Sequence, residues 1–172
     1  MTENDEHIIC ISCGFCCDRT LFDVAKLDED EILRDKFIPI ETRINDVRFF
    51  KLPCPYFDKK CTIYQEKKPN ICTKFKCMHL RNAIKGNITK EDAMRTIENA
   101  RKLRDEILDE YFRLKGRRIT FREVFVESFK NPEFDTNEEL KLLKYRANLL
   151  DILLTKHFKS DELFKEFYEI IE

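Results

Sequence analysis

The eight cysteines of this 172-residue chain are the side chains best suited to chemistry. They form a tight N-terminal run and a wider second group, and none lies beyond position 77: Cys10, Cys13, Cys16, Cys17, Cys54, Cys61, Cys72 and Cys77. A thiolate is a strong ligand for soft metals, and ligands separated by two residues can wrap one centre. We therefore expect all eight cysteines to be metal ligands.

The rest of the sequence points to a reducing compartment. Residues 1–7 are acidic and polar and lack the apolar stretch of a secretory signal, and no apolar run is long enough to span a membrane. We expect a cytoplasmic protein without a membrane partner. In that compartment, clustered cysteines are more often metal ligands or catalytic thiols than disulfides.

The cysteine spacing favours an iron–sulfur cluster over zinc. Cys10, Cys13 and Cys16 match the first three positions of the bacterial ferredoxin run C-x2-C-x2-C. In that run the last cysteine precedes a proline, and Cys54-Pro55 could take this part from a distant segment. Zinc ribbons instead prefer two C-x2-C pairs, whereas six, ten and four residues separate the later cysteines here.

The number of metal sites stays open. Cys16 and Cys17 are adjacent, and adjacent side chains rarely point at one centre, so they face different sites or one of them is not a ligand. Eight sulfurs could form two four-ligand sites, or one cluster with spare thiols. Gly14, between Cys13 and Cys16, suits either the left-handed backbone of a tight chelate turn or an ordinary turn.

Basic residues surround the second cysteine group, and only Asp58 and Glu66 oppose them: Lys51, Lys59, Lys60, Lys67, Lys68, Lys74, Lys76 and Arg81. They could compensate the negative charge of thiolates, dock an acidic redox partner or RNA, or form a solvated loop. His79 follows Cys77 by two residues and could add a ligand, although a surface histidine is the commoner case.

The motifs resemble one known family. Their residues are Cys13-Gly14-Phe15-Cys16-Cys17, Cys54-Pro55-x-Phe57, Cys61-x-Ile63-Tyr64 and Pro69-x-x-Cys72-x-x-Phe75-x-Cys77. This pattern is similar to the YkgJ-type cysteine-cluster family, a zinc- or iron-chelating domain, and covers about Cys10 to Cys77. Lys68 replaces the usual arginine before Pro69, and Lys76 replaces the usual proline before the last cysteine. These departures concern local turn geometry rather than ligation.

The resemblance also suggests a cofactor. A similar domain occurs in flagellin lysine methylases, where it is associated with a [4Fe-4S] cluster. By analogy, the resemblance implies a [4Fe-4S] cluster on these cysteines, with Zn²⁺ as the alternative.

Residues 1–80 predict a small, irregular α+β module that depends on metal for its folding. Short strands are expected over residues 20–24, 47–52 and 61–64. Asp28 is a candidate cap for a short helix over residues 29–36, and Pro69 suits the first turn of a helix that carries Cys72. The apolar runs between these elements are short, so a closed core is hard to build without a metal site.

Residues 81–172 predict a helical region of about four helices, so the fold class is mainly α. Apolar residues repeat at steps of three and four over residues 90–115, 121–130, 137–158 and 161–171. Capping boxes or similar signals precede them, beginning at Thr89, Thr120, Thr136 and Ser160, and Gly116 suits the end of the first helix.

Composition limits the function classes. The chain has 33 acidic and 32 basic residues, so nucleic-acid binding is not expected. It has three glycines, no glycine-rich cofactor loop and no set of nucleophile, base and acid, which argues against an enzyme. Three functions stay open: an iron–sulfur electron-transfer or accessory subunit, a zinc-stabilised protein-interaction module, and an iron–sulfur-dependent methyl-transfer enzyme.

The C-terminal helices predict a docking surface. The helix over residues 137–158 has one apolar seam and a second set beside it, Leu142, Leu149 and Leu153. This is more apolar surface than one neighbouring helix covers, so a protein partner or a second copy of the chain is expected there. The alternative is a helix buried by its own neighbours.

Overall fold

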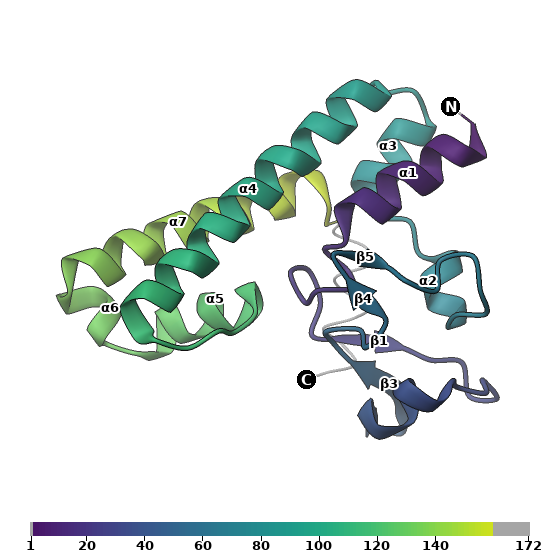
Figure 1. Cartoon of the computed structure of the whole chain (residues 1–172), viewed down its shortest axis with the longest axis horizontal. Helices are drawn as coiled ribbons and strands as arrows, with labels where there is room; N and C mark the ends of the chain where they lie inside the picture. The colour runs from purple at the N-terminus through teal and green to yellow at the C-terminus, as the bar shows by residue number, and fades with distance from the viewer. Residues whose placement is uncertain (1, 160–172) are drawn as a thin grey trace.

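The computed structural model describes residues 2–159, and its helices dominate the fold (Figure 1). This confirms the expected class, mainly α with a small α+β part. The helices are α1 (Glu3–Cys13), α2 (Asn70–Lys74), α3 (Met78–Ile84), α4 (Lys90–Lys115), α5 (Phe121–Lys130), α6 (Glu133–Thr136) and α7 (Glu138–His157).

The long helices begin and end close to the predicted positions. Thr89 caps α4 by accepting the Asp92 N–H, and Thr120 and Glu123 form a complete capping box for α5. Gly116 ends α4 with a left-handed backbone at φ 69°. The helix predicted over residues 161–171 lies outside the described residues.

Helix α1 is absent from the sequence prediction. Thr2 Oγ1 accepts the Asp5 N–H at 3.2 Å, and the Asp5 carboxylate accepts the Thr2 N–H at 3.0 Å. This pair is a capping box with aspartate in place of glutamate, and it was the available signal for the helix. The first two cysteines, Cys10 and Cys13, therefore lie on a helix rather than in a loop.

The strands are short and antiparallel. The three-stranded sheet has the order β1 (Val24–Lys26), β3 (Val47–Lys51), β2 (Glu41–Ile44), and β4 (Phe57–Asp58) pairs with β5 (Lys60–Cys61). The strand predicted over 47–52 is confirmed. Those predicted over 20–24 and 61–64 share only one residue each with β1 and β5.

The helix predicted over residues 29–36 is wrong. Arg48 Nη1 donates to the carbonyl oxygens of Asp28, Glu29 and Glu31, which a helix would need for its own hydrogen bonds. The Glu31 carboxylate also accepts the Asn70 N–H at 2.6 Å. These contacts keep residues 29–34 out of a helix, and only a 3₁₀ helix, η1 (Asp35–Ile40), begins at the end of the predicted range.

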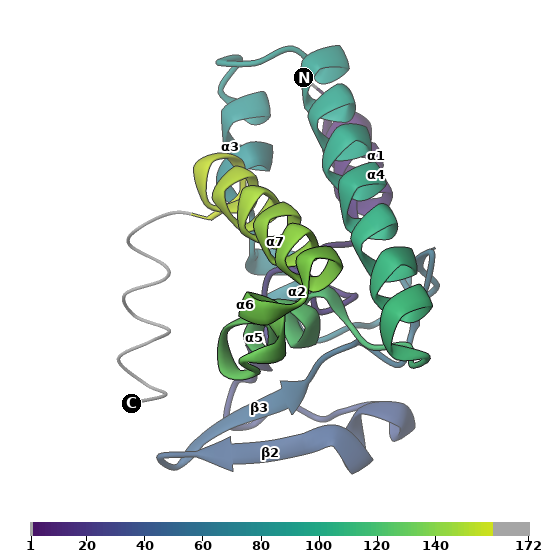
Figure 2. The same cartoon turned by 90° about the vertical axis from the view of Figure 1, so that its left-hand side faces the viewer.

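Two hydrophobic cores divide the molecule. The larger runs along the helices from Ile9 to Phe158, and it includes α1, which packs against α4 (Figures 1 and 2). The smaller core lies beneath the sheet and consists of Leu27, Phe37, Phe50, Leu52 and Ile63. Cysteines contact both cores, because Cys13, Cys16 and Cys77 pack against the larger one and Cys54 and Cys61 against the smaller one.

No helix among residues 2–159 is both long enough and apolar enough to cross a membrane.

Candidate metal centre

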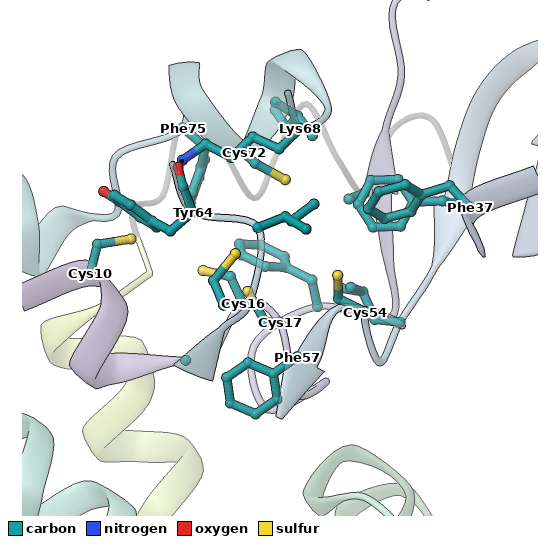
Figure 3. A pocket seen from close by; sticks show the side chains of 18 of the residues that line it. Cys10, Cys16, Cys17, Phe37, Cys54, Phe57, Tyr64, Lys68, Cys72 and Phe75 are labelled. Carbon is teal, nitrogen blue, oxygen red and sulfur yellow. Dashed lines mark hydrogen bonds between the residues drawn. The ribbon is translucent and has the colours of Figure 1, made fainter. Parts of the chain in front are cut away.

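A cavity of about 280 Å³ opens where the helical and strand regions meet. Six of the eight predicted ligands line it, as Figure 3 shows in part: Cys10, Cys16, Cys17, Cys54, Cys61 and Cys72. The other two, Cys13 and Cys77, are partly buried against the helical core. The structure therefore brings cysteines from both groups of the sequence to one region.

The turn after α1 places the central cysteines. Gly14 ends α1 with φ 72°, and its carbonyl accepts the Cys17 N–H at 2.8 Å. The Cys17 carbonyl in turn accepts the Cys54 N–H at 2.7 Å. This hydrogen bond joins the N-terminal run to the second cysteine group through the backbone. Of the two conformations that the sequence left open for Gly14, the structure shows the left-handed one, at the end of α1.

Each remaining cysteine sits on its own short element. Cys61 lies in β5 opposite Phe57, and Cys72 lies in α2. Cys77 caps α3, because its sulfur accepts the Leu80 N–H at 3.5 Å. Helix α2 was expected to carry Cys72, whereas α3 and its cysteine cap were not predicted.

The cavity wall is mainly apolar. Its aromatic lining consists of Phe22, Phe37, Phe50, Phe57, Phe75 and Tyr64. Burial, with a smaller effect of neighbouring thiols, raises the pKa of Cys10 to about 11 and that of Cys72 to about 12. Burial also raises the pKa of Cys13 and Cys16 well above the usual range. A metal that binds these groups must therefore displace protons.

Few of the nearby cations act on the thiols. Lys68 lines the cavity, lies 3.6 Å from the centre of the Tyr64 ring, and opposes the rise in the pKa of Cys10 and Cys72. Lys74 and Lys76 instead form ion pairs with carboxylates on neighbouring segments. Arg81 of the same basic segment likewise opposes the rise in the pKa of Cys77. Charge compensation therefore comes from Lys68 at the cavity and from Arg81 beside Cys77.

His79 is a core residue rather than a surface one. Only 3% of its surface is exposed, its Nε2 donates to the Ala93 carbonyl at 3.0 Å, and its ring packs on Phe158. Burial lowers its pKa and favours the neutral form. Because Nε2 is engaged with the backbone, His79 has a structural role.

The donor set fits a soft metal. All eight cysteines are free thiols, and sulfur ligands select zinc, copper(I) or iron–sulfur centres. Across residues 2–159, no three Cys, His, Asp or Glu side chains already converge closely enough to hold a single ion. The thiols therefore gather in one region without closing on one point.

Comparison with known families gives one match, over residues 9–109, to the CxxCxxCC family, described as a "Putative zinc- or iron-chelating domain". The match covers more than half of the chain and all eight cysteines, and it ends within α4. No curated protein and no solved structure matches the chain with significance. On the strength of these residues, the chain belongs to the CxxCxxCC family of zinc- or iron-chelating domains.

Proposed function

We propose that the cysteines of this protein hold a [4Fe-4S] cluster, and that the chain acts in the cytoplasm as an electron-transfer or accessory subunit. The cavity between the two cores carries this proposal. It has room for far more than one ion, and six thiols face it.

Its volume favours a cluster over a single zinc ion. Four thiolates on zinc lie at about 2.3 Å from the metal, so their sulfur atoms nearly touch and leave no cavity between them. The cavity here is about 280 Å³, whereas one water occupies roughly 30 Å³ in the liquid. A cluster of several iron and sulfide atoms suits that space better.

The walls support a redox role. When bound, an iron–sulfur cluster supplies one-electron transfer at a potential set by its solvent exposure and hydrogen bonding. Phe22, Phe57 and Phe75 form part of the apolar cavity wall, whereas the residues Cys10 and Cys72 are exposed to solvent. The thiols thus have an apolar wall on one side and a route to solvent on the other.

Anaerobic purification followed by metal analysis tests the proposal. We expect coloured protein that contains iron and acid-labile sulfide in equal amounts, and that loses its colour in air. As a control, Lys67→Ala changes an exposed residue outside the cavity, so this variant should contain as much iron and sulfide as the unchanged protein. Colourless protein with stoichiometric zinc and no iron would overturn the proposal in favour of a zinc-stabilised interaction module.

A further inference from the structure

We propose that the eight cysteines form two separate four-thiolate centres, one of Cys10, Cys13, Cys16 and Cys77 and one of Cys17, Cys54, Cys61 and Cys72. The proposal rests on the metal binding proposed above, but it does not depend on which metal is bound. It assigns every cysteine to one of the two centres, and the neighbours Cys16 and Cys17 belong to different centres.

The first set lies on the helical side. Cys10 and Cys13 are three residues apart in α1, so they share one face of the helix. Helix α3, which Cys77 caps, packs against α1, and Lys76 pairs with Glu6 of α1 at 2.6 Å. The set also shares its packing, because three of its members contact the helical core: Cys13, Cys16 and Cys77.

The second set lies on the strand side. All four of its members line the cavity, which they share with Cys10 and Cys16, and the Cys54 N–H donates to the Cys17 carbonyl at 2.7 Å. Cys54 and Cys61 flank one hairpin and pack against the smaller core. Ile71, next to Cys72, packs against that same core. Three separate segments thus carry these four thiols to the wall of the same cavity.

The adjacent cysteines mark the boundary. The Cys16 side chain contacts the helical core, whereas the Cys17 backbone binds the segment that carries Cys54. Figure 3 shows both side chains at the cavity, on the turn that follows α1. A single peptide bond therefore links the two proposed centres, which fits adjacent ligands that serve different metals.

Paired deletions test the division. Cys13→Ala/Cys77→Ala removes two ligands of the first set, and Cys61→Ala/Cys72→Ala removes two of the second. We expect each double variant, purified anaerobically, to lose the metal of one centre and keep that of the other. The matched control, Cys13→Ala/Cys61→Ala, also removes two thiols but takes one from each set, and should weaken both centres. Loss of all metal in either first variant, or of none, would overturn the division.

A titration of the wild-type chain guards against variants that do not fold. Cobalt(II) added to the metal-free protein should give thiolate-to-cobalt absorbance that saturates at two equivalents, and saturation at one equivalent would overturn the division. The two proposals fail in different ways. Two equivalents of zinc in the purified protein would overturn the iron–sulfur assignment and leave two centres. One iron–sulfur cluster per chain, with cobalt saturating at one equivalent, would support the iron–sulfur assignment and overturn the division into two centres.

Discussion

The helical region, formed by α4, α5 and α7, and the cysteine region, between Cys17 and Cys77, are stabilised in different ways. In the helical region, capping residues and one continuous apolar core hold elements of up to 26 residues. In the cysteine region, strands of two to five residues depend on hydrogen bonds between distant segments. The first pattern is stable through local signals and burial, whereas we expect the second to depend on bound metal for much of its order.

Metal removal should have the largest effect on folding, and this effect should be confined to the cysteine region. Structural zinc contributes about 10–16 kcal/mol to the folding of small metal domains, so removal of all metal by chelation should unfold the cysteine region while α4, α5 and α7 persist. Near-UV circular dichroism should change, and proteolysis should cut first between Cys17 and Cys77. Unchanged near-UV signal and protease resistance after complete metal removal would contradict this.

The next largest effect on stability is expected from substitution of a glycine in the cysteine region. An alanine Cβ at Gly14 would lie 2.7 Å from the Phe57 ring, in addition to the left-handed backbone cost. Gly86 has a similar φ of 75° with nothing within 4 Å, so Gly86→Ala is the matched control and should cost about 1–2 kcal/mol.

We expect Gly14→Ala to cost at least twice as much and to lower the metal content, measured by denaturant unfolding and metal analysis. Equal losses of stability in the two variants would show that contact between the α1 terminus and β4 does not matter.

Arg48→Gln should have a smaller effect, confined to the strand side. Arg48 pairs with Glu41 and donates to three carbonyls, so its loss should cost about 1–3 kcal/mol. Arg43→Gln is the control, since Arg43 is about half exposed and should change stability by less than about 0.5 kcal/mol. Amide hydrogen exchange in Arg48→Gln should then become faster over residues 24–51 and stay unchanged in α4. An equal increase in both places would contradict the idea that the two regions are stabilised independently.

The smallest effect on folding is expected at Leu149. Leu142, Leu149 and Ile152 are all more than half exposed on α7, whereas the seam residues Leu150 and Leu154 are buried. Leu149→Glu should change stability by less than about 0.5 kcal/mol and leave the metal content intact, but abolish association with a partner subunit or a second copy. Light scattering and co-purification measure this, and a monomeric wild type without a partner would contradict it.

The sequence predicted the helical region far better than the cysteine region. Helices α4, α5 and α7 follow from capping and periodicity, which are local, and their core residues Ile97, Ala147 and Leu150 are buried as expected. The helix predicted over residues 29–36 is wrong because Arg48, which is distant in sequence, donates hydrogen bonds to backbone carbonyls in and beside that segment. The missed helix α1 had a weak local signal, an aspartate where a capping box usually has glutamate.

The candidate site shows the same limit. Spacing and family resemblance predict all eight cysteines as ligands, because ligand chemistry depends on residue type and local spacing. Their grouping was not predictable, since it depends on long-range contacts such as the hydrogen bond between Cys17 and Cys54. The burial of His79 likewise depends on α4 and on Phe158, which lie far along the chain.

The hairpin turn at Asn45–Asp46 bears on how this chain can vary in length. Both residues are exposed with left-handed backbones, and the turn lies within the long segment between Cys17 and Cys54. Insertions there would extend β2 and β3 outward without moving a thiol, whereas one residue added between Cys16 and Cys17 would rotate the ligands of one proposed centre relative to those of the other. Length variation should therefore be tolerated at the hairpin and selected against within the N-terminal cysteine run.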